Sequence, residues 1–195
     1  MASVVELRPR AREDFTASLG MVVFLASWAM MFSTLFFAYA FVRSRATIWP
    51  PPGVPVLPIG LPALNTAVLL ASSFTFARGL STLRRGARSS LPVWVALTFL
   101  LGAVFLGLQV QVWLSLSRAG LHINSGGIYG SAFYAMTTFH ALHVAVGLLI
   151  LGWVFIQALR GKYSEHNQVK VQLCTMFWHF VDVVWILMFL TLYVL

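Results

Sequence analysis

Five long apolar stretches constrain this 195-residue chain more than any other feature of its sequence. They lie at roughly 16–42, 61–79, 91–117, 129–159 and 171–194. A helix of about 20 residues crosses the roughly 30 Å of hydrocarbon in a bilayer, and each stretch reaches or approaches that length. Barrel strands would be about 10 residues long with alternating polarity, whereas these stretches are apolar at odd and even positions alike. We therefore expect an all-α integral membrane protein, with residues 1–195 forming one domain of five transmembrane helices.

The basic residues predict how this bundle is oriented. The chain has 13 Lys and Arg residues, 5 Asp and Glu residues, and a formal net charge of +8. Ten of the basic residues fall on the side that holds the N-terminus and the loops near 80–90 and 160–170; Arg43, Arg45 and Arg118 fall on the other. Because positively charged loops stay in the cytoplasm, we expect the N-terminus inside and the C-terminus outside. Basic residues in these positions set topology, so we expect no nucleic-acid partner.

Few side chains within the five stretches are ionisable or carry an amide. They are Asn65, Gln109, Gln111, His140, His143, His179 and Asp182. The two histidines of 129–159 are three residues apart, as are His179 and Asp182, so each pair shares a helical face. A carboxylate alone in hydrocarbon costs several kcal/mol, and a hydrogen-bonded partner recovers much of that cost. We expect Asp182 to accept a hydrogen bond from a histidine of 129–159 or from a partner subunit.

Three roles are open to these polar residues. Axial ligation of a haem by His143 and His179 would need a flat space for the porphyrin, and Gly147 is the one glycine close by toward the inner half. A proton relay would stop at the midplane, because the first three stretches contain no carboxylate or histidine. The role we favour is structural: Asn65, Gln109 and the other polar groups fix the register of packed helices. We therefore predict no catalytic, cofactor-binding or metal-binding residues.

Three motifs in this chain resemble subunit III of the haem–copper terminal oxidases, which include the cytochrome c and quinol oxidases. They are "LNTAVLLASS" at 64–73, "GGIYGSAFYAMTTFHALHVAVG" at 126–147 and "FWHFVDVVW" at 177–185. The segment "WPPPG" at 49–53 precedes them, as it does in the family. The likeness extends over 16–195 and is to the short, five-helix bacterial form of the family.

The resemblance implies an accessory, non-catalytic subunit of an oxidoreductase complex in the bacterial inner membrane, with no haem or copper of its own. Haem and copper would lie in the partner subunits, chiefly subunit I, with subunit II and others in the complex. Such a subunit stabilises subunit I, supports its proton uptake during aerobic respiration and holds phospholipid in a cleft. His140, His143, His179 and Asp182 align with signature positions of the family. Candidate contacts for lipid headgroups, at the ends of spans, are Arg43, Arg78 and Arg160.

The sequence departs from the family at three ionisable positions. Trp28 stands where the family often has a carboxylate, "LQVQVW" at 108–113 lacks a customary glutamate, and Gln172 lies near a third missing one. These losses argue against a direct part in proton transfer through those positions. Two alternatives stay open: a membrane anchor that binds haem b, and a subunit associated with a nitric oxide reductase. A quinol and a c-type cytochrome are both compatible electron donors for the complex.

Overall fold

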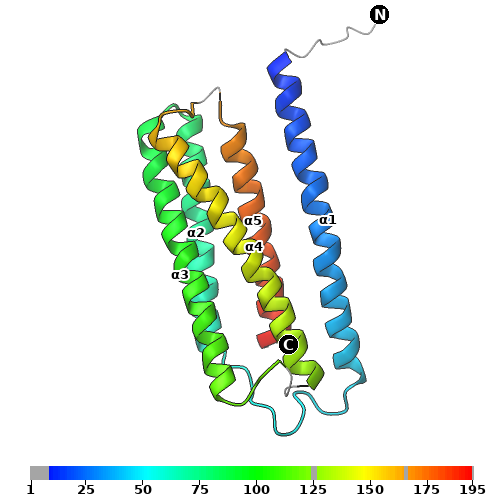
Figure 1. Ribbon diagram of the computed structural model, residues 1–195. Helices are drawn as coiled ribbons and strands as arrows, with labels where there is room; N and C mark the ends of the chain where they lie inside the picture. The colour runs from blue at the N-terminus through cyan, green and yellow to red at the C-terminus, as the bar shows by residue number, and fades with distance from the viewer. Residues whose placement is uncertain (1–8, 124–126, 165–166, 195) are drawn as a thin grey trace, which may run out of the picture.

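The computed structural model describes residues 9–123, 127–164 and 167–194. Its five long helices are α1 (Pro9–Arg45), α2 (Gly60–Arg84), α3 (Leu91–Arg118), α4 (Gly127–Leu159) and α5 (Val169–Phe189), shown in Figure 1. A 3₁₀ turn, η1 (Arg88–Ser90), precedes α3, and a π-helical turn, η2 (Leu190–Val194), extends α5. Five helical segments of the described chain are long and apolar enough to span a membrane. The predicted all-α, five-helix membrane fold is confirmed.

Short turns connect most of the helices, and glycine makes two of them possible. Gly86, between α2 and α3, has a φ of +82°, and Gly161, after α4, has a φ of +67°. A residue with a Cβ rarely adopts this backbone conformation. The amide of Gly86 donates to the carbonyl of Leu83 at 3.0 Å, which closes the end of α2. The chain turns back after each helix of the bundle, and α2, α3, α4 and α5 run alternately up and down (Figure 1).

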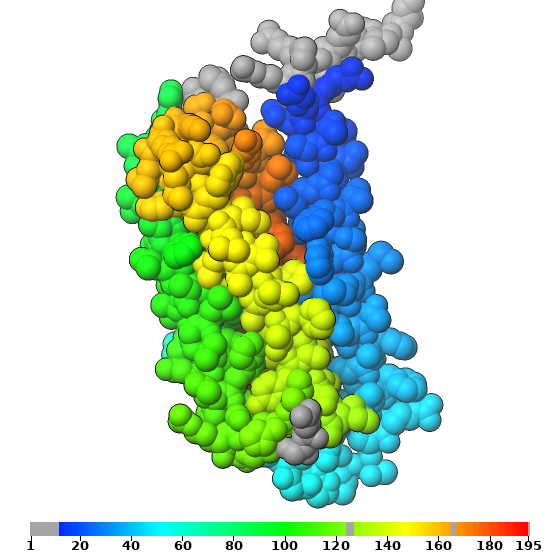
Figure 2. All heavy atoms as spheres, in the orientation of Figure 1, coloured from blue at the N-terminus to red at the C-terminus, as the bar shows by residue number. Residues whose placement is uncertain are grey.

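Helices α2 to α5 form a compact bundle, and α1 lies along one side of it (Figure 1). Figure 2 shows α5 between α4 and α1 in the upper half of the molecule, whereas α4 and α1 meet in the lower half. Among the described side chains of α1, Phe32 and Tyr39 alone are buried. The bundle, by contrast, encloses two whole tryptophans of α5, Trp178 and Trp185.

Trp178 is the centre of the bundle packing, because two glycines make room for its indole ring. A Cβ atom at Gly102 of α3 would lie 2.7 Å from Cη2 of Trp178, and one at Gly147 of α4 would lie 2.9 Å from Cζ3. Both distances are too short for a real Cβ atom. The indole nitrogen donates a hydrogen bond to Oγ of Ser72 on α2 at 3.0 Å. One side chain therefore joins α5 to the three other helices of the bundle.

The two ends of the bundle differ in charge. We call one the basic end: it carries the α2–α3 turn and the α4–α5 loop, and its exposed cations include Arg12, Arg84, Arg85, Arg88, Arg160, Lys162 and Lys170. At the opposite end, residues 46–59 form an extended strap that crosses from α1 to α2 (Figure 1). The ring of Trp49 in this strap packs against Tyr39 at 5.7 Å and Tyr129 at 5.1 Å between centroids. That the basic end faces the cytoplasm stays a prediction.

Candidate functional site

Asn65 and Gln109 form a buried amide pair between α2 and α3. Nδ2 of Asn65 donates to Oε1 of Gln109 at 3.4 Å, and both residues are almost fully enclosed. At the next position along α2, Oγ1 of Thr66 accepts a hydrogen bond from the Trp185 indole of α5 at 2.9 Å. These bonds connect α2 to both neighbours. We expect Gln111 to serve in the same way, but it is exposed on the surface, and no hydrogen bond joins it to another helix among the residues the structure describes.

His140 of α4 is enclosed among aromatic rings. Its imidazole lies 5.8 Å from the Phe105 ring of α3 and 5.2 Å from the Trp185 ring of α5, between centroids. Neither ring nitrogen has a hydrogen-bond partner within the described part of the chain. The imidazole therefore packs as a flat ring in the core, beside the direct contact between Phe105 of α3 and Trp185 of α5, whose centroids are 4.8 Å apart.

His143, one turn further along α4, connects the bundle to α1. Its Nδ1 lies 2.6 Å from the carbonyl oxygen of Phe139. Because a carbonyl can only accept, Nδ1 carries the proton and donates it there. The imidazole ring lies 4.3 Å from the Trp28 ring and 5.2 Å from the Phe32 ring, between centroids. His143 is thus held by α1 on one side and by its own helix on the other.

His179 and Asp182 lie on the side of α5 that faces α2. Nδ1 of His179 is hydrogen-bonded to the Ser73 hydroxyl of α2. Oδ2 of Asp182 lies 3.9 Å from the same Nδ1, one turn along the helix. The expectation that a histidine of α4 would pair with Asp182 is wrong: its neighbour is His179, because the His143 ring faces α1 instead. A partner-subunit donor to Asp182 stays a prediction.

These positions disfavour the ligation of a haem between His143 and His179. His143 contacts two aromatic rings of α1, whereas His179 contacts α2, so the imidazoles face different neighbours. The space beside Gly147, which a porphyrin would need, is filled by the Trp178 indole. No group of three histidine, cysteine, aspartate or glutamate side chains that could hold a metal ion is found among the residues the structure describes.

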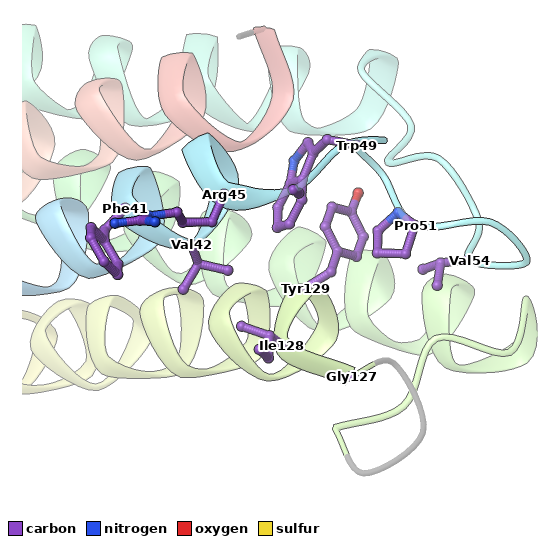
Figure 3. Close-up of a pocket in the computed structure, with 10 residues that line it drawn as sticks. Phe41, Val42, Arg45, Trp49, Pro51, Val54, Gly127, Ile128 and Tyr129 are labelled. Carbon is purple, nitrogen blue, oxygen red and sulfur yellow. The ribbon is translucent and has the colours of Figure 1, made fainter.

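An open apolar groove lies at the strap end between α1 and α4 (Figure 3). It has a volume of about 560 Å³, and Arg45 of α1, Trp49 of the strap and Tyr129 of α4 are among its lining residues. A second hollow of about 500 Å³ continues it along the same two helices and shares Val42 and Ile128 with it. Among the described residues of the two linings, the Arg45 guanidinium at the end of α1 is the one charged group. The groove suits a hydrocarbon chain with an anionic head.

Of the three arginines expected to contact lipid headgroups, Arg43 and Arg160 lie at helix ends, whereas Arg78 lies within α2, which continues to Arg84. Arg43 is half-buried in the last turn of α1, Arg160 is exposed just beyond α4, and the Arg78 guanidinium lies 4.9 Å from the Phe74 ring centroid on α2.

Close to Arg160, the buried phenol of Tyr163 sits in the α4–α5 loop. Burial, and secondarily the nearby Cys174, raises the pKa of Tyr163 to about 12, so this phenol stays neutral.

Comparison with known proteins agrees with this architecture. The family model for cytochrome c oxidase subunit III matches residues 14–195. The chain belongs to the cytochrome c oxidase subunit III family. Cytochrome c oxidase subunit 3 of Thermostichus vulcanus is 40% identical over 178 residues, which cover 91% of this chain and 86% of that protein. The protein of the same name from Synechocystis sp. is 37% identical over 177 residues, covering 90% of this chain and 74% of that protein.

Two further relatives differ in how much of their length this chain covers. Cytochrome c oxidase subunit 3 of Loxodonta africana is 36% identical over 180 residues, which cover 89% of this chain but 67% of that protein. A probable cytochrome c oxidase subunit 3 of Nocardia farcinica is 36% identical over 178 residues and is covered to 86%. Membership of the subunit III family and the five helices make this chain a multi-pass membrane subunit of a haem–copper oxidase.

Trp28 of α1 packs against the histidine that connects α4 to α1. Its indole meets the His143 ring edge to face, at an interplanar angle of 83°. Sequence reasoning missed this pairing and the bond between Ser73 and His179; it placed Trp178 in the packing but did not identify its neighbours. The glycines at 102 and 147 were the available signal for the buried indole.

Proposed function

We propose that this chain is the accessory, cofactor-free subunit III of a respiratory haem–copper oxidase in a bacterial inner membrane. In this role it stabilises the catalytic subunit I and supports proton uptake and lipid binding during aerobic electron transport. The observation that carries the proposal is the placement of its membrane histidines. His140 is packed between aromatic rings, His143 connects two helices, and His179 is bonded to Ser73. These contacts support a structural role and leave redox chemistry to the partner subunits.

Purification of the tagged chain from its native membrane tests this proposal. We expect a haem-containing partner to co-purify and to give the Soret absorbance, and we expect the separated chain to give none. Haem retained by the separated chain, and lost on His143→Ala or His179→Ala, would favour the membrane anchor for haem b instead.

Substitution of Asp182 tests whether this residue serves the assembly of the complex or its chemistry. Asp182 is buried against α2, so Asp182→Asn should weaken assembly with subunit I more than it slows turnover of the complex that does assemble. The matched control is Asp14→Asn, because Asp14 is exposed near the start of α1. Yield of assembled complex and turnover per haem are the two readouts. Full assembly with severely impaired turnover would contradict a structural role.

We further propose that the strap-end groove holds one acyl chain of a phospholipid whose phosphate pairs with Arg45. A volume near 560 Å³ is in the range of small-molecule sites, and a cation at the rim of an apolar groove suits an anionic headgroup. Arg45→Ala should lower the lipid retained by the purified complex, measured by native mass spectrometry. Arg118→Ala is the matched control, because Arg118 is exposed at the same end and lines neither part of the groove. Equal lipid loss in both variants would contradict the assignment.

A further inference from the structure

A second groove opens between α2 and α5 in the half of the bundle nearer the basic end. It has a volume of about 360 Å³. Its polar lining comprises Ser81, Arg84, Gln172, Thr175 and His179. In the strap-end groove, by contrast, most of the side chains around Arg45 are apolar or aromatic. This groove therefore differs in chemistry from a channel built to hold an acyl chain.

The mouth of this groove lies at the basic end. Nη2 of Arg84 on α2 donates to Oε1 of Gln172 on α5 at 3.4 Å. Ten positions separate Gln172 from Asp182 on α5, which is about 15 Å along the helix at about 1.5 Å per residue. The groove and the residues at its inner end thus lead from the aqueous surface toward the middle of the membrane.

His179 stands at the inner end of the groove and connects it to the buried carboxyl. The His179 side chain is 42% exposed, whereas that of Asp182 is 5% exposed. Neither Asp182 oxygen has a hydrogen-bond partner within the described part of the chain, and its nearest basic group is the imidazole at 3.9 Å. The groups close enough to act on the carboxyl are His179 and Ser73. Ser73 bonds Nδ1 of this half-exposed imidazole, so the other ring nitrogen still needs a polar neighbour, which hydrocarbon cannot supply.

The groups on the neighbouring helices leave this site a single route to water. Between residues 15 and 42, α1 has no carboxylate, histidine, lysine or arginine, and the same holds for α2 between 61 and 77 and for α3 between 91 and 117. On α4, His140 and His143 are enclosed and contact aromatic rings. Toward the strap end, α5 continues with the buried Trp185 and Met188. The site is therefore open toward the basic end and closed beyond Asp182.

We propose that water fills the α2–α5 groove and that His179 and Asp182 together form a proton-binding site in exchange with the aqueous phase at the basic end. A hydronium ion in the groove gives its proton to the imidazole of His179, the imidazole passes a proton to the Asp182 carboxylate, and a water molecule is left behind. No electron moves, and the proton returns by the same path. This site deepens the proposed function, on which it rests for its use within an oxidase, because it names where this subunit could hold a proton.

Cysteine accessibility in the assembled oxidase tests whether the groove holds water. Ala77 lines the groove, whereas Ala71, also exposed on α2, lines no groove described above. A charged, membrane-impermeant thiosulfonate added at the basic end should modify Ala77→Cys about tenfold faster than Ala71→Cys, because the thiolate forms in water. Equal, slow labelling would mean that lipid or protein fills the groove, and would overturn the proposal. Mass spectrometry of the labelled peptide separates these sites from the buried Cys174.

Infrared spectroscopy of the same complex tests the carboxyl. A protonated Asp182 gives a carbonyl band that Asp182→Asn removes, that grows as pH falls and that shifts rapidly in D₂O. Ala77→Phe, which fills the groove, should slow that shift about tenfold relative to Ala71→Phe. A band that is absent at every pH, or exchange that is unchanged in Ala77→Phe, would overturn the proposal. Failure to co-purify with a haem protein would instead refute the proposed function, so the two failures are distinct.

Discussion

Helices α1 and α5 are comparably apolar in sequence but differ in how they are packed. In the most apolar segment of α1, 6% of the residues are buried. In the most apolar segment of α5 with its π-helical extension, 50% are buried. The buried positions of α5 include two tryptophans, each hydrogen-bonded to a hydroxyl of α2, and Asp182, which lies beside His179 of its own helix. The comparison shows that apolar character brings a helix into the membrane, whereas shape and hydrogen bonds decide what it packs against.

Removal of the Trp178 ring should produce the largest difference between the two regions. Trp178→Ala leaves a cavity between α3 and α4 and removes the hydrogen bond that the Ser72 hydroxyl accepts, so we expect a loss of about 3–5 kcal/mol in the free energy of unfolding. Trp153→Ala is the matched control, because Trp153 is 46% exposed on α4. Thermal unfolding of the detergent-solubilised chain measures both. If the two variants melt at the same temperature, Trp178 is not the centre of the packing.

Glycine substitutions should sharpen the same comparison. Gly102→Ala places a methyl group against the Trp178 ring and should cost about 1–3 kcal/mol in the free energy of unfolding. Gly20→Ala, on α1, meets nothing within 4 Å and should be neutral or stabilising by up to about 1 kcal/mol. The same melting assay applies to both variants. A stabilising Gly102→Ala would show that the indole can shift away at little cost.

A third test concerns how α1 is attached. Phe32 is buried against His143 and Phe180, so Phe32→Ala should raise hydrogen exchange of the α1 amides several-fold while exchange in α2 to α5 is unchanged. Phe37 is 71% exposed on the same helix, and Phe37→Ala should leave hydrogen exchange of the α1 amides unchanged. Faster exchange throughout the bundle in Phe32→Ala would mean that α1 and the bundle unfold as one unit.

The smallest effect is expected from a hydroxyl pair. Oγ1 of Thr75 on α2 and Oγ1 of Thr98 on α3 are hydrogen-bonded at 2.8 Å. Thr98→Val keeps the shape of the side chain and should cost about 0.6 kcal/mol of stability, a typical value for such bonds between membrane helices. Thr34→Val on α1 should cost less, because its exposed hydroxyl bonds only the Met30 carbonyl of its own helix. A cost for Thr34→Val as large as that for Thr98→Val would contradict the difference between the regions.

The sequence predicted most of the membrane fold, and the part it missed has a consistent cause. Long apolar stretches require backbone hydrogen bonds within each segment, so five stretches predict five helices before any packing is known. The buried polar residues at 65, 109, 140, 143 and 182 could be recognised for the same reason, because each is out of place in an apolar stretch. Which group each of these polar side chains meets depends on how its helix is rotated about its own axis. The hydropathy pattern of one sequence does not specify that rotation.

Asp182 illustrates the difference. Spacing correctly placed it on the same helical face as His179, but depth alone suggested a histidine of α4 as its partner. Two packing contacts decided otherwise. The ring of His143 meets Trp28 and Phe32 of α1, and Ser73 of α2 binds His179. Neither contact follows from hydropathy, because aromatic rings and hydroxyl groups are compatible with lipid-facing and buried positions alike.

By itself, then, the sequence determined that this protein is a five-helix membrane subunit of the haem–copper oxidase type, since hydrophobic length and motif order are properties of the chain. Only the tertiary structure decided that Trp178 fills the space between Gly102 and Gly147, and that a polar groove leads toward Asp182. The physical reason is that close packing is set by the shapes of several helices at once. No one segment specifies the space that its neighbours leave.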